Sequence, residues 1–215
     1  MSLESEIFME FIALGAAAYL LGSIPSAVWI GKLLYGVDVR EHGSGNAGTT
    51  NVLRVLGAKA AIPVFAVDTL KGLLAVLAAY LVPGVDRSAE FFGVVKIACG
   101  LLAVVGHMYP VFAGFRGGKG VATTLGVAIA IQPVGALVAL GVFAAVFAAT
   151  RYVSLGSLCA GLSFPPVVIF LLREPKLSIR IFVIFACLLL FYTHRKNIRR
   201  LLSGTEPKTS FKKKS

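Results

Sequence analysis

Residues 121–149 read VATTLGVAIAIQPVGALVALGVFAAVFAA, and the division of this run decides the topology of the chain. It carries no charged residue, and it is too long for one untilted helix, since about 20 apolar residues cross a bilayer. Gln132 and Pro133 lie near its middle. Proline removes a backbone donor and disfavours a helical conformation in the residue before it. We therefore expect two shorter helices with a turn at Gln132-Pro133, forming either two short spans or a re-entrant hairpin.

The rest of the chain is as apolar as this run. Of the 215 residues, 57% are hydrophobic and 14% are charged, whereas soluble domains carry about 25% charged residues. Further runs of spanning composition are Phe8–Leu34, Ala60–Val82, Phe91–Phe112, Ser154–Leu172 and the shorter Ile179–Tyr192. Lipid offers the backbone no hydrogen-bond partners, so these runs must be helical. The sequence predicts an all-α, polytopic integral membrane protein with about seven transmembrane or partly spanning helices, folded as one domain over residues 1–215.

The distribution of positive charge predicts the orientation. Lys and Arg number 21 against 10 Asp and Glu, a net charge of +11, and eight of these cations lie between Arg195 and Lys214. Cytoplasmic segments hold the excess of Lys and Arg. A turn at Gln132-Pro133 places residues 116–119, Arg151 and the basic tail from about residue 195 on one side. We expect this side to be cytoplasmic, the N-terminus to lie outside, and the tail to contact anionic lipid rather than nucleic acid.

The first polar segment with chemical character is GSGNAGTTNVLR, residues 43–54. Glycines, short hydroxyl and amide side chains and one Arg can converge on an anion, because backbone amides and a planar guanidinium both suit phosphate. The candidate phosphate-binding residues are Gly43, Ser44, Gly45, Asn46, Thr49, Thr50 and Asn51, with Arg54 as a catalytic candidate. The alternative is a flexible polar loop that is rich in turn formers.

The second segment is GHMYPVFAGFRGGKGVATT, residues 106–124. It is not a Walker A motif, because Ala113 and Gly120 stand where that motif needs Gly and Ser or Thr. Its glycines still permit close backbone approach, and the following helix offers its N-terminus to an anion. We therefore expect a phosphate cradle made by Gly117, Gly118, Gly120 and the catalytic candidate Lys119. The alternative is a turn between two spans in which the cations only set orientation.

The third segment is HRKNIRRLLSGTE, residues 194–206. On one helix His194 and Asn197 would share a face and could meet the other two loops. The alternative is a basic amphipathic helix lying on anionic lipid. Ser154 would fall on the same side of the membrane as an isolated candidate. Within the second span, Asp68 and Lys71 are either functional or paired with each other.

The three segments, in this order and separated by apolar spans, resemble the PlsY family of bacterial acyl-phosphate:glycerol-3-phosphate acyltransferases. The matching stretches are GSGNAGTTNVLR, GHMYPVFAGFRGGKGVATTLG, RYVSLGS and HRKNIRRLLSGTE. The resemblance implies an enzyme of the bacterial inner membrane with its loops in the cytoplasm. It implies transfer of a fatty acyl group from acyl-phosphate to the 1-position of glycerol 3-phosphate, yielding lysophosphatidic acid and inorganic phosphate in phospholipid biosynthesis.

The residues suit such chemistry. The His-to-Asp dyad with a five-residue offset, found in the more widespread glycerol 3-phosphate acyltransferases, is absent, because Ala47, Phe112 and Arg199 follow the three histidines at that offset. An acyl-phosphate is already activated, so direct attack without a covalent acyl-enzyme is expected, with His194 or a substrate phosphate oxygen as proton acceptor. We expect neither a cofactor nor a metal. A transporter for small organophosphates and a lipid-binding scaffold are the competing classes.

Overall fold

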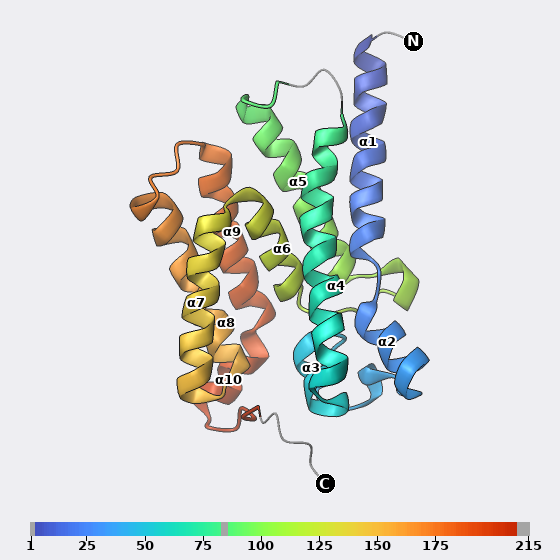
Figure 1. Ribbon diagram of the computed structural model, residues 1–215, viewed down its shortest axis with the longest axis vertical. Coiled ribbons are helices and arrows are strands. Elements are labelled where there is room, and N and C mark those ends of the chain that lie inside the picture. The colour runs from blue at the N-terminus through green and yellow to red at the C-terminus, as the bar shows by residue number, and fades with distance from the viewer. Residues whose placement is uncertain (1–2, 83–85, 210–215) are drawn as a thin grey trace.

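The computed structural model describes residues 3–82 and 86–209 as a bundle of helices, with strands absent from these ranges. In Figure 1, α1, α4 and α5 form one side of the bundle, α7, α8 and α9 form the other, and α6 lies between them. The helices are α1 Leu3–Gly22, α2 Ser26–Tyr35, α3 Thr49–Leu56, α4 Ala58–Leu77, α5 Glu90–Met108, α6 Val121–Ile131, α7 Pro133–Thr150, α8 Val153–Pro166, α9 Leu177–Thr193 and α10 Arg195–Leu202. The all-helical prediction is confirmed.

The expected break at Gln132-Pro133 separates α6 from α7. Gln132 is the only residue between the two helices, and Pro133 begins α7, where its missing N–H costs nothing. The Gln132 side chain donates to Glu174 Oε2 at 2.6 Å, which ties this corner to the connection between α8 and α9. With 11 residues, α6 is too short to cross a bilayer alone.

Of the other expected runs, the four longer ones are helical and apolar enough to span, and α7, the second half of the divided run, is long enough as well. Five described segments pass this test by length and composition, and α9 together with α10, bent by 61°, would be a sixth. With α6 they make the seven spanning or partly spanning segments that the sequence predicted. The first run differs from expectation in one respect: residues 23–25 interrupt it, because Pro25 cannot continue α1 and instead precedes α2.

Glycines let two pairs of helices approach closely. A Cβ on Gly22 would lie 2.1 Å from Ala103 O, and one on Gly106 would lie 2.3 Å from Tyr19 O, so α1 and α5 touch backbone to backbone. Helices α4 and α6 meet in the same way through Gly72 and Gly126. Such small-residue contacts are typical of helix packing in lipid, where close van der Waals contact replaces the hydrophobic drive.

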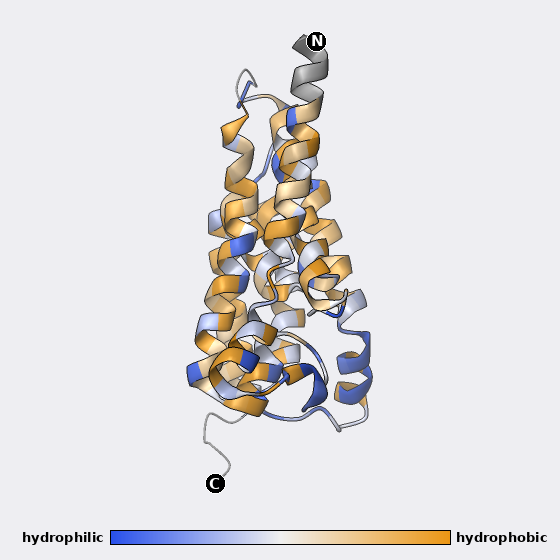
Figure 2. Cartoon of the chain, turned by 90° about the vertical axis from the view of Figure 1, so that its right-hand side faces the viewer, coloured by the Kyte–Doolittle hydropathy of each residue, from blue (hydrophilic) through white to orange (hydrophobic). Residues whose placement is uncertain are grey.

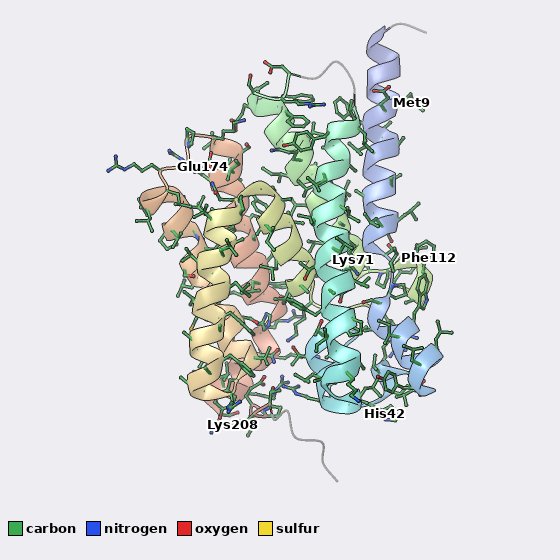
Figure 3. All side chains as sticks on the ribbon, viewed as in Figure 1. Met9, His42, Lys71, Phe112, Glu174 and Lys208 are labelled. Carbon is green, nitrogen blue, oxygen red and sulfur yellow. The ribbon has the colours of Figure 1, made fainter. Side chains whose placement is uncertain are left out.

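The two ends of the bundle differ in polarity. Figure 2 shows apolar residues along the helices and hydrophilic residues gathered toward the end that carries the C-terminus. Helices α3 and α10 lie at this end in Figure 1. His42 and Lys208 lie there too, whereas Met9 and Glu174 lie toward the opposite end (Figure 3). The fold thus collects the first and third polar segments, which are far apart in the sequence, at one end.

Candidate active site

A cavity of about 720 Å³ opens between the two sides of the bundle. One part of its wall is polar and comes from the loop before α3, from Lys119, from α10 and from Glu206, and it also includes Asp68 and His107. The other part is apolar and comes from α6, α7, α8 and α9. Its lining combines small side chains, such as Ala136 and Ala160, with larger ones, such as Leu140, Phe143 and Phe164. A molecule with an ionic head and a hydrocarbon tail matches both parts.

Asn51 shapes the first polar loop from within. Its amide nitrogen donates to Val39 O at 2.7 Å and to His42 O at 3.1 Å, and its amide oxygen accepts from Ser44 N at 2.8 Å. The residue is 2% exposed, so its hydrogen-bonding groups are occupied by the loop itself. Asn51 therefore holds the loop in shape, which is a different role from the phosphate contact that its side-chain type suggested. Arg54, in the last turn of α3, extends from this loop into the cavity wall.

Lys119 joins the second and third polar segments. Its Nζ donates to Asn197 Oδ1, 78 residues further along the chain. Gly120 follows with φ 76°, a left-handed conformation that suits glycine, and α6 begins directly after it. Burial lowers the pKa of Lys119 to about 8; the charge of Glu206 offsets part of this effect, while Arg200 and Arg54 add to it. A phosphate that binds beside this buried side chain stabilises its charged, protonated form.

Glu206, together with its partner Arg200, lines the cavity but was not among the candidates from the sequence. Its Oε1 accepts from Ser154 Oγ and from Asn197 Nδ2, each at 2.8 Å, and its Oε2 accepts from Arg200 Nε at 2.6 Å. Arg54 lies 3.9 Å from the same carboxylate. Burial alone would raise the pKa of Glu206, but these hydrogen bonds outweigh it and the pKa is lowered. The available signal was its position as the single acid in the cationic stretch 195–214.

His194 lies at the bend between α9 and α10, not within one helix as expected. Its Nδ1 lies 2.9 Å from Leu190 O, so the neutral ring donates through Nδ1 and keeps Nε2 as an acceptor. Burial and the charge of Lys119 lower the pKa of His194 to about 4, which leaves the ring neutral at pH 7. His194 and Asn197 both line the cavity despite the bend.

The structure brings together most of the predicted site. Twelve of the fifteen candidates line the cavity: Ser44, Gly45, Asn46, Thr49, Thr50, Asn51, Arg54, Lys119, Gly120, Ser154, His194 and Asn197. Three glycines are outside its lining, namely Gly43, Gly117 and Gly118. Gly43 packs against the Asn51 side chain, and Gly117 packs against backbone oxygens at the end of α5. Among the residues that the structure describes, His, Cys, Asp and Glu form no group of three that could hold a metal.

Fold and site together define a helical integral membrane protein whose cavity joins a cationic polar end to an apolar arm. The profile of the glycerol-3-phosphate acyltransferase family matches residues 12–204. The chain belongs to this family, and it is a membrane-embedded glycerol-3-phosphate acyltransferase. The resemblance inferred from the motifs is confirmed.

Individual relatives extend over almost the whole chain. The glycerol-3-phosphate acyltransferase of Clostridioides difficile is 44% identical over 97% of this chain and 99% of its own length. That of Geobacillus kaustophilus is 46% identical over 90% and 93%. The crystal structure of PlsY, an integral membrane glycerol 3-phosphate acyltransferase, in its glycerol 3-phosphate form has a TM-score of 0.82 at 43% identity and covers 94% of this chain and 96% of that chain. The lysophosphatidic acid form has a TM-score of 0.80 at 42% identity with the same coverage.

Proposed function

We propose that the chain transfers an acyl group from acyl-phosphate directly to the 1-hydroxyl of glycerol 3-phosphate. The products are 1-acyl-glycerol 3-phosphate and inorganic phosphate. The hydroxyl oxygen attacks the acyl carbonyl carbon, the bond from that carbon to the phosphate oxygen breaks, and the hydroxyl proton leaves to an acceptor. The observation that carries this proposal is the meeting of Arg54, Lys119 and Asn197 around Glu206 at the mouth of the apolar arm.

The polar wall supports the binding of two phosphorylated substrates side by side. Arg54, Lys119 and Arg200 supply positive charge, and Gly120 and the hydroxyls of Thr49 and Thr50 lie in the same wall. Two like-charged substrates repel each other in water, so holding them in contact is a large part of the catalysis. Lys119 faces the site where negative charge grows as the phosphate departs.

The apolar arm supports an acyl tail on the donor. Along α8 the cavity wall runs from Ser154 to Phe164, a length of about 15 Å at the rise of an α-helix. Each buried methylene contributes about 0.8 kcal/mol, so such an arm binds a fatty chain strongly. An acyl-phosphate is already a mixed anhydride, and no strong protein nucleophile is needed.

Two groups can take the hydroxyl proton. His194 offers a neutral Nε2 in the cavity wall, and the departing phosphate offers an oxygen. The His194→Ala variant separates the two. An acid limb of the rate profile that persists in this variant, with only a raised KM, assigns the proton to phosphate.

The orientation of the enzyme follows from the charge distribution. Helices α3 and α10, which carry Arg54 and Asn197 of the polar wall, lie at the same end of the bundle (Figure 1). We place this end in the cytoplasm of a bacterium, at the inner membrane, where glycerol 3-phosphate is available. Transporters hold their substrates near the middle of the bilayer, and the end position of Arg54 and Asn197 favours an enzyme instead.

The test is acyl transfer by purified protein in detergent. Acyl-phosphate and glycerol 3-phosphate should give one inorganic phosphate for each lysophosphatidic acid, and acyl thioesters should not replace the donor. Lys119→Ala should remove at least about two orders of magnitude of kcat/KM, in line with the loss of one electrostatic stabiliser. Arg173→Ala, a cation on the opposite connection, is the matched control. Near wild-type turnover by Lys119→Ala, or transfer from thioesters alone, would reject the proposal.

A further inference from the structure

A buried polar group lies where α2, α4 and α5 meet. Asp68 Oδ1 accepts from Ser26 Oγ at 2.7 Å and from Lys71 Nζ at 2.8 Å, and it lies 3.4 Å from His107 Nδ1. Lys71 Nζ also donates to Ile24 O at 3.0 Å. The pairing of Asp68 with Lys71, one of the two expectations for these residues, is thereby confirmed. We call Ser26, Asp68, Lys71 and His107 the Asp68 group.

This group is costly in a membrane protein. Asp68 is 1% exposed, Lys71 is 3% exposed and His107 is 6% exposed. Charged residues within spans pair with each other and mark functional sites by default. Lys71 alone would neutralise the carboxylate, so the pair does not account for His107. The position of the His107 ring supplies the missing reason.

The ring of His107 lies directly against the loop that carries Lys119. Gly118 N donates to His107 O at 3.2 Å. A Cβ on Gly118 would lie only 2.2 Å from His107 Nε2 and 3.1 Å from Ala47 O. Gly118 is not among the residues with positive φ, so its backbone would accept any side chain. Glycine is needed at this position because the imidazole occupies the space of a side chain.

We propose that Asp68 and His107 are positioning residues for the reaction, acting through Gly118 on Lys119. Asp68 fixes the orientation of the His107 ring, the ring supports Gly118, and the next residue directs its ammonium toward Asn197. Gly118 then serves packing against α5 rather than contact with phosphate. The inference rests on the proposed role of Lys119 in binding phosphate.

The test is a double-mutant cycle between Gly118 and His107. His107→Asn keeps a nitrogen able to donate to Asp68 and removes the ring edge that fills the space beside Gly118. Gly118→Ala should raise the KM for glycerol 3-phosphate or acyl-phosphate on the order of tenfold in the wild-type background, as overpacking costs of this size predict. In the His107→Asn background the same substitution should cost less than about threefold, because the collision is gone.

Gly117→Ala is the matched control. Its Cβ would lie 2.0 Å from His107 O and 2.7 Å from Met108 O, which are backbone atoms that no side-chain substitution removes. It should therefore impair the enzyme equally in both backgrounds. If Gly118→Ala has the same effect with and without the ring, the inference is overturned, because a glycine needed for phosphate contact gains nothing from His107→Asn.

The pH dependence of kcat/KM tests the inference even if the Gly118→Ala variant does not fold. Without the ring in His107→Ala, the loop loosens and Lys119 gains water, so the alkaline limb of kcat/KM should move above pH 8. The other groups around Lys119 remain in place in this variant: Arg54, His194, Asn197, Arg200 and Glu206. Simple destabilisation lowers the amount of active enzyme without moving the limb. An unmoved limb with an unchanged KM overturns the inference, whereas a wild-type enzyme inactive with acyl-phosphate counts against the proposed function instead.

Discussion

The titration of Lys119 gives the sharpest test of the proposed mechanism. Its pKa is lowered to about 8 by burial and by Arg200 and Arg54, with Glu206 opposing them. A lowered lysine pKa means that the charged form is lost within reach of ordinary assays as pH rises. With a pKa of about 8, about nine-tenths of the side chains are charged at pH 7 and about one-tenth at pH 9.

The perturbation is therefore pH itself, and the quantity is kcat/KM, which reports the free enzyme. We expect kcat/KM to fall by about tenfold per pH unit above 8, because Lys119 can help to neutralise the departing phosphate only in its ammonium form. Substrate phosphates lose their second proton near pH 6, so they do not contribute to this limb. The assay is initial-rate phosphate release between pH 6 and pH 10 at low substrate.

Lys119→Arg provides the comparison. Its guanidinium remains charged throughout this range. The kcat/KM of the variant should therefore be lower than that of the wild type but should not fall between pH 8 and pH 10. A limb that persists unchanged in Lys119→Arg would refute the assignment, because another group would then control it.

Three further outcomes follow from the same structure. Glu206→Gln should lower the free energy of unfolding by about 2 kcal/mol, measured by thermal unfolding in detergent, because it removes charge-assisted hydrogen bonds. It should also move the alkaline limb of kcat/KM below pH 8, since Glu206 raises the pKa of Lys119. A limb that moves to higher pH would contradict this. With a mixture of acyl-phosphates as donors, Ala160→Phe should shift the products toward shorter acyl chains, as measured by mass spectrometry. The control Ala145→Phe, on the exposed face of α7, should leave the products unchanged. If both variants give the same products, the acyl tail does not bind in this arm. In a cysteine-free background, an impermeant thiol reagent should label Arg173→Cys in intact cells and Lys208→Cys only after permeabilisation, and the opposite pattern would invert the topology.

The helices could be predicted because their cause is local. A bilayer forces any long apolar run into a helix, and Pro133 and Pro25 interrupt helices through their own covalent structure. Residues 23–25 were nevertheless missed as a break, because the run around them is apolar and Pro25 is a single signal. The polar loops were recognisable by composition, since glycines, hydroxyls and cations together are suited to phosphate wherever the loops lie.

What each of these residues does was decided by the contacts it makes in the folded chain, some with nearby loop residues and some with segments far away in the sequence. Asn51 and Gly118 look like phosphate-binding residues in a linear reading, yet one is occupied by its own loop and the other is seated on His107. Glu206 looks like an unremarkable acid in a basic tail, yet it gathers Ser154, Asn197 and Arg200. Composition and periodicity indicate whether a segment lies in lipid or in water, and this depends only on residues that are neighbours in the sequence. Which donor meets which acceptor depends on loop geometry and on helix packing that joins residues 42 and 78 positions apart, and only the folded chain determines it.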